Sequence, residues 1–175
     1  YEYVDLGLPS GLKWAVHNVG ASAAEDYGDY YAWGEIETKD SYTQQNSVTY
    51  GMPMEDISGD PQYDVARALW GETWRLPTRD EQKELLDNCT WEWTSQNGVN
   101  GYLVTGSNGN SIFLPAAGYK ENSSHTEVGE YGYYWSSTPQ SNSNLGAYYL
   151  YMSSSSKLSY YYARVAGQSV RAVSE

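Results

Sequence analysis

Cysteine is nearly absent from this chain of 175 residues, which contains one, Cys89. A single cysteine excludes an intrachain disulfide framework. A chain of this length buries roughly 70% of its unfolded surface on folding, so it needs neither a disulfide nor a metal to stabilise a core. Long hydrophobic runs are missing as well, and none approaches the ~18 residues that cross a bilayer. We therefore expect no direct insertion into a membrane.

Basic residues are scarce. Lys and Arg number 10 against 22 Asp and Glu, which gives a formal net charge of -12. A surface this acidic repels phosphate backbones, so nucleic acid is excluded as a partner unless one face is locally basic. Phenylalanine is scarce too, with 1 Phe against 19 Tyr and 7 Trp. Many of the large rings therefore carry a polar tip, which suits half-buried and contact positions.

Acidic residues are missing altogether from residues 131–174, which are rich in Tyr and Ser and contain the cations Lys157, Arg164 and Arg171. No Pro/Gly-rich linker and no repeat of 20–50 residues divides the chain. We therefore expect one domain, residues 1–175, with two differently used regions. The chain starts at Tyr1 without Met or a signal peptide, so we expect it to be a trimmed, monomeric domain of a larger protein.

Two helices are predicted. The first covers residues 61–70, where Asp60-Pro61 supplies an N-cap and a proline in the first turn. The second covers residues 79–88, where Thr78 and Glu81 can form a capping box.

Short strands fill much of the remaining chain. The pattern of apolar and turn residues predicts them at residues 3–8, 12–16, 102–105, 111–114, 133–137, 148–153 and 169–173. In the strand at residues 148–153, Tyr148, Leu150 and Met152 alternate with Tyr149, Tyr151 and Ser153, so the two sets point to opposite faces. Strands, two helices and then more antiparallel strands predict an α+β fold, with two helices packed on short antiparallel strands.

Several motifs resemble a known family. The segment at residues 74–78, followed by an acidic helix, is similar to the helix-entry motif of the C-type lectin fold as formylglycine-generating enzymes use it. Five further motifs resemble the Fibrobacter-type major paralogous domain of gut Bacteroidetes and span nearly the whole chain: residues 4–15, 27–35, 113–119, 134–138 and 169–171. The resemblance implies a C-type lectin-like fold and a non-enzymatic recognition role outside the cell or on its surface.

Some domains of that type are variable proteins of diversity-generating retroelements, in which mutagenesis of Asn codons alters a ligand-facing surface. The resemblance places such positions here among Tyr149, Tyr151, Ser153, Tyr160, Tyr161, Tyr162, Ala163, Val165 and Ala166. Gln168 departs from that pattern, because adenine-directed mutagenesis of an Asn codon cannot yield Gln. Whether this chain is itself diversified stays open.

The sequence contains no motif that indicates a catalytic or metal-binding site. The pair of copper-binding cysteines that the resemblance to formylglycine-generating enzymes would require is missing, and His17 and His125 show no metal-ligand spacing. Calcium needs 6–8 oxygen ligands, whereas residues 131–174 offer no carboxylate. An acidic surface loop is the preferred interpretation of Glu25, Asp26 and Asp29. We predict no catalytic residue, no metal and no cofactor.

A recognition surface is the preferred function. Tyrosine offers a large amphipathic area with little side-chain entropy, and serine offers adaptable hydrogen bonds. Tyrosine rings can also stack on sugars, so the expected partner is a protein or a glycan on another cell surface. The predicted ligand-binding residues are Asn142, Asn144, Tyr149, Tyr151, Ser153, Ser155, Tyr160, Tyr161, Tyr162, Ala163, Val165 and Ala166.

An alternative function stays open. The tyrosines could face a neighbouring domain, in a structural module at the tip of a pilus-like assembly or on a surface lipoprotein. Two arginines, Arg75 and Arg171, are expected to pair with buried acids in either case.

Overall fold

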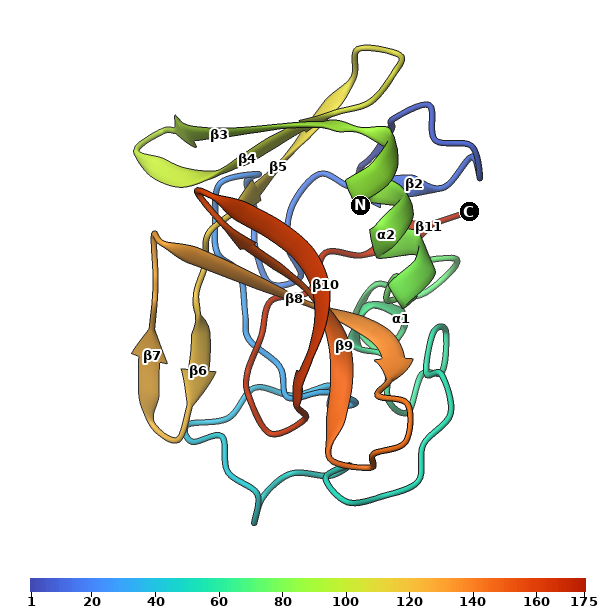
Figure 1. Ribbon diagram of the computed structural model, residues 1–175. Helices are drawn as coiled ribbons and strands as arrows, with labels where there is room; N and C mark the ends of the chain where they lie inside the picture. The colour runs from blue at the N-terminus through green and yellow to red at the C-terminus, as the bar shows by residue number, and fades with distance from the viewer.

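Strands dominate the computed structural model, which describes residues 1–175 (Figure 1). The helices are α1 (Val65–Trp70) and α2 (Arg79–Asn88). The strands are β1 (Tyr3–Asp5), β2 (Lys13–Ala15), β3 (Thr90–Gln96), β4 (Val99–Thr105), β5 (Ser111–Pro115), β6 (Tyr119–Glu121), β7 (Ser124–Thr126), β8 (Tyr131–Pro139), β9 (Gly146–Ser153), β10 (Ser156–Ala163) and β11 (Val173–Ser174).

The strands form four small antiparallel sheets, in the orders β1-β2-β11, β10-β9-β8, β3-β4-β5 and β6-β7. The first of these joins the two ends of the chain. Helix α2 packs against the β10-β9-β8 sheet, and the β6-β7 hairpin stands beside β8 (Figure 1). Neither helix is long and apolar enough to cross a membrane.

The expected α+β fold with two helices packed on short strands is wrong, and with it the C-type lectin-like fold. Helix α1 has six residues and α2 has ten, whereas four strands are present that we did not expect: β3, β6, β7 and β10. The fold is therefore mainly β. Strand β3 carried a readable signal, because Trp91 and Trp93 alternate with polar residues. The short β6 and β7 exist chiefly because they pair with each other.

Helix α1 begins later than its proline suggested. Its N-cap is Asp64, whose carboxylate accepts bonds from the backbone N–H groups of Ala66 and Arg67. The same buried carboxylate also accepts bonds from the N–H groups of Gly59 and Leu76, at 2.7 and 2.8 Å. Because Asp64 and not Asp60 caps the helix, α1 begins at Val65, and residues 61–63 form a turn before it.

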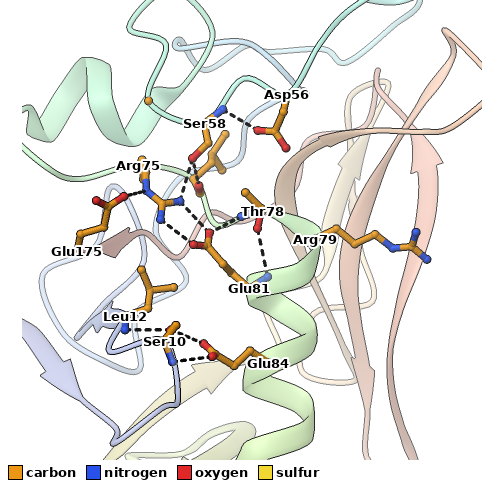
Figure 2. A network of polar contacts seen from close by, with 12 residues as sticks. Ser10, Leu12, Asp56, Ser58, Arg75, Thr78, Arg79, Glu81, Glu84 and Glu175 are labelled. Carbon is orange, nitrogen blue, oxygen red and sulfur yellow. Dashed lines mark hydrogen bonds and ion pairs between the residues drawn. The ribbon is translucent and has the colours of Figure 1, made fainter.

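Helix α2 confirms its predicted bounds and its capping box. Thr78 Oγ1 accepts a bond from the N–H of Glu81, and the Glu81 carboxylate accepts one from the N–H of Thr78. Arg75 donates two bonds of 2.8 and 2.7 Å to the same carboxylate (Figure 2). Glu175 accepts a further bond from Arg75. The expected pairing of Arg75 with an acid is confirmed, and it ties the start of α2 to the end of the chain.

Two hydrophobic cores lie on opposite faces of the β10-β9-β8 sheet. Trp135 and Tyr149 belong to a core that includes Trp33 and Trp74. On the other face, Tyr134, Leu150 and Met152 belong to a core that includes Trp14 and Leu85. The predicted alternation along β9 is confirmed, but neither face of its centre is exposed to solvent.

The segment from Arg164 to Ser174 runs through the interior and is buried at every position. Most of its pairing consists of isolated β-bridges, so in place of the strand expected at residues 169–173 the structure has only the short β11. Arg171 is buried within this segment and pairs with no acid, contrary to expectation. It donates instead to the side-chain oxygen of Asn18 and to the backbone carbonyls of Ala15, Val16 and Phe113.

Candidate ligand-binding surface

Strand β10 carries an exposed pair of tyrosines along a free sheet edge. It pairs with β9 alone, so its other edge has no neighbouring strand. Tyr160 and Tyr161 are 52% and 45% exposed. Consecutive strand residues point to opposite faces, yet the two ring centroids lie only 4.8 Å apart, edge to face. Both rings must therefore lean over the free edge, where they form an aromatic ridge.

A shallow hollow adjoins this ridge where β10 ends. Its volume is about 360 Å³, and its lining includes Tyr50, Leu145 and Tyr161, together with the polar residues Gln140 and Ser143. The Gln140 side chain packs closely on β9 at Gly146, where a Cβ would collide with Gln140 Oε1 and approach the carbonyl oxygen of Tyr162 in β10. Rings for stacking and a few hydrogen-bonding groups, with no charge among them, are the features of a site for a neutral organic ligand.

Part of the predicted ligand-binding set meets at this hollow. Tyr161, Tyr162 and Ala163 line it, and Asn142 and Asn144 are exposed in the loop that borders it. Asn142 has a φ of 62°, a left-handed conformation that asparagine adopts more readily than most residues. Burial raises the pKa of Tyr162 to about 12, so its hydroxyl stays protonated at neutral pH.

A second part of the set lies at the other end of the β9-β10 hairpin. Ser153 and Ser155 line a hollow of about 370 Å³ with Trp93 and Tyr131. Tyr151, half-buried, packs near Tyr131 with ring centroids 5.8 Å apart. Ser155 and Tyr161 are six positions apart along extended chain, which corresponds to about 20 Å. The structure thus splits the predicted set between two places.

Four of the predicted ligand-binding residues are buried. Tyr149, Ser153, Val165 and Ala166 are 4%, 7%, 8% and 0% exposed. The expectation that Tyr149 faces solvent is wrong, because its ring stacks on Tyr133 at 5.5 Å within a covered face of the sheet. Val165 and Ala166 lie in the interior C-terminal segment. Because a buried residue cannot vary without repacking its neighbours, a diversified surface would be limited to the exposed positions.

Arg79 and Tyr148, which were not among the predicted ligand-binding residues, extend the surface from the hollow toward α2. The Arg79 guanidinium lies 3.8 Å above the Tyr148 ring, and its Nε donates to Ser159 Oγ at 3.2 Å. The Tyr148 hydroxyl bonds to Ser141, and this bond lowers the pKa of Tyr148. No pattern in the chain signals these contacts, because they join α2 to strands some 70 to 80 residues away.

Of the three cations in residues 131–174, only Lys157 is exposed. Arg164 and Arg171 are each 1% exposed and donate mainly to backbone carbonyls, so they add little charge to the surface. Lys157 is exposed and lies instead with Lys83 along a hollow between α2 and β10, near Arg79. The surface cations therefore come from both α2 and β10.

Glu25 and Asp26 are possible metal ligands of this chain, and Cys89 carries its one thiol. No group of three or more His, Cys, Asp and Glu side chains is arranged to hold a metal ion. Glu25 accepts bonds from Gln96 and Asn97, and Asp26 accepts backbone N–H bonds within its own loop. Cys89 is half-buried, and burial raises the pKa of its thiol.

Comparison with known proteins adds one match. Neither the curated proteins nor the solved structures gave a match to this chain. The resemblance to the Fibrobacter-type domain therefore stays a prediction. The chain is similar over residues 90–173 to a domain of unknown function, DUF8237. These residues contain the β10 ridge and most of the hollows beside Tyr161 and Ser155, but not α2.

Proposed function

We propose that this chain is a non-enzymatic ligand-binding domain that works outside the cell or at its surface. The observation that carries the proposal is the ridge of Tyr160 and Tyr161 on the free edge of β10. Large rings that stay exposed on a soluble protein often mark a contact site, and tyrosine is enriched among the residues that dominate binding energy.

A glycan fits this surface better than a flat protein epitope. The ridge presents ring faces on which sugars can stack, and the adjoining hollow adds the Gln140 amide and the Ser143 hydroxyl for sugar hydroxyls. The hollow is lined by no carboxylate, imidazole or thiol, so its chemistry suits binding more than bond cleavage.

The ridge gives the first prediction. We expect Tyr161→Ala to weaken binding of the ligand by about 2 kcal/mol, or roughly 30-fold, because the variant removes a central stacking ring. Its melting temperature should change little, since Tyr161 is 45% exposed. A glycan array identifies the ligand, and calorimetric titration of the wild type and the variant measures the affinity.

Tyr3→Ala is the matched control, because Tyr3 is a 53% exposed tyrosine on β1, away from the ridge. Equal affinities for the wild type and for Tyr161→Ala would contradict the proposal. If the ridge instead contacts a neighbouring domain of an assembly, no glycan binds and Tyr161→Ala lowers solubility or assembly.

A further inference from the structure

We propose that Arg79 is an anion receptor at the margin of the β10 surface, so that the ligand is a glycan carrying an acidic group. This inference rests on the proposed function and adds the chemical class of the ligand. It follows from how Arg79 is held, from the charges around it and from its position beside the ridge.

The Arg79 side chain is fixed on two sides. The Tyr148 ring supports the guanidinium at 3.8 Å, and Ser159 Oγ accepts the Nε–H bond at 3.2 Å. The two terminal nitrogens have no hydrogen-bond partner within the protein. Figure 2 shows the side chain extending away from the Arg75–Glu81 network. A guanidinium held this way offers two parallel N–H groups to a carboxylate or sulfate, with less entropy to lose than a mobile side chain.

The charges around Arg79 favour an anion. The ion pairs of this protein engage Lys39 and Arg75, but not Arg79, Lys83 or Lys157. Lys83 lies one helical turn after Arg79. Lys83 and Lys157 both line a hollow of about 610 Å³, in which Asp87 is the one acidic lining residue. Lys83 and Lys157 thus line one hollow together with Ser159, the hydrogen-bond partner of Arg79, on a chain whose net charge is -12. The Lys157 ammonium lies 5.8 Å from the centroid of the Tyr102 ring.

The receptor is continuous with the ridge. The rings of Tyr148 and Tyr161 meet edge to face, with centroids 6.4 Å apart. The Tyr148 hydroxyl contacts Ser141, in the loop that borders the neutral hollow. One ligand can therefore stack a sugar ring on Tyr161 while its acidic group reaches Arg79. The strongly acidic remainder of the protein repels long polyanions, which favours a glycan with isolated acidic groups.

An array of neutral, carboxylated and sulfated glycans, with a Glu-rich peptide beside them, tests this inference. We expect the wild-type chain to retain carboxylated or sulfated glycans, and we expect the array to distinguish these two sources of negative charge. Arg79→Gln should weaken binding of the retained glycan on the order of tenfold or more, and Arg79→Lys should restore it only in part. Raising the salt concentration should weaken the wild type more than Arg79→Gln.

Lys13→Gln is the matched control, because it removes a cation without an ion pair from β2, in a different sheet from β10, where the Lys13 ammonium lies over the Tyr3 ring and does not line the hollow. It should leave the affinity unchanged. If Arg79→Gln fails to fold, Lys83→Gln takes its place, since no bond of the Lys83 side chain stabilises the structure; we expect a weaker loss of the same sign.

The outcomes separate this inference from the proposed function. Retention of neutral glycans that Tyr161→Ala abolishes and Arg79→Gln leaves intact overturns the anion receptor and keeps the glycan-binding function. Retention of the Glu-rich peptide alone overturns the glycan assignment. An array on which nothing is retained overturns both.

Discussion

Raising the pH from 8 to 11 is expected to unfold this domain at room temperature. Burial raises the pKa of six tyrosines well above the ordinary value near 10: Tyr30, Tyr31, Tyr133, Tyr134, Tyr149 and Tyr162. For Tyr134 and Tyr162 the pKa is about 12. A bond from the Tyr133 hydroxyl to Glu127 adds to the effect of burial there.

The sign of this effect follows from proton binding. In the unfolded chain these phenols release their protons near pH 10, whereas in the folded chain they keep them to about pH 12 or beyond. Between those values the unfolded state binds fewer protons, so the free energy of unfolding falls as the pH rises. At pH 11 each buried ring removes about 1.4 kcal/mol. The five buried rings together remove on the order of 7 kcal/mol, which is comparable with the total stability of most domains. Tyr162 adds less, because its half-buried ring is partly screened by solvent.

Three groups oppose this trend. Burial lowers the pKa of Arg171 to about 10, so near pH 11 the unfolded state holds the arginine proton more tightly, which contributes about 1.4 kcal/mol in the stabilising direction. The lowered pKa values of Tyr148 and of the buried Arg164 act in the same direction. These groups do not offset five buried phenols, so the net effect of high pH remains strongly destabilising.

Urea unfolding at pH 8, 10 and 11 measures this loss, and absorbance at 295 nm follows phenol ionisation. Tyr149→Phe is the sharpest variant, because the Tyr149 ring is 4% exposed and its removal deletes one buried phenol. It should resemble the wild type at pH 8 and exceed it by about 1.4 kcal/mol at pH 11. Tyr160→Phe, at an exposed position, is the matched control for loss of a phenol. Smooth titration of all tyrosines near pH 10 without loss of structure would contradict this account.

Replacing Arg171 by leucine is expected to cost about 4 kcal/mol or more. The guanidinium donates to Asn18 Oδ1 and to the Phe113 carbonyl, both at 2.8 Å, and to the carbonyls of Ala15 and Val16. Leucine leaves these acceptors without a donor in the interior, and each unpaired buried acceptor costs about 1–3 kcal/mol. Lysine is a poor replacement, because a compact ammonium cannot span acceptors on separate segments.

Urea unfolding at pH 7 and soluble yield measure the effect of Arg171→Leu. Arg79→Leu serves as the matched control, since it also removes an arginine but leaves no buried carbonyl without a donor. We expect it to cost about 1 kcal/mol or less, as is usual for surface substitutions. Equal unfolding midpoints for Arg171→Leu and the wild type would show that the buried guanidinium is dispensable.

Several local features were predictable because they depend on neighbouring residues. The capping box of Thr78 and Glu81 begins α2 where the sequence indicated. The turn at residues 106–110 joins β4 to β5 as an antiparallel hairpin. The alternation along β9 follows from the covalent geometry of any strand. Each of these depends on spacing within a few residues, which no distant contact overrides.

The candidate surface was only partly predictable. Tyr161 and Tyr162 were identified from the tyrosine-rich composition of their segment, and Asn142 and Asn144 belong to the same predicted ligand-binding set. Tyr149 was included because alternation indicates which side chains share a face, but not whether that face is covered. Both faces of β9 are covered here by cores built from residues throughout the chain.

Local residue patterns were thus sufficient for where α2 begins, which side chains along β9 share a face and which segment is rich in tyrosine. Packing between distant segments determined which of those tyrosines meet solvent, why Arg171 is buried among carbonyls and how Arg79 comes to lie on Tyr148. The physical reason is that a side chain's direction follows from its own backbone, whereas its burial depends on what the rest of the chain places against it.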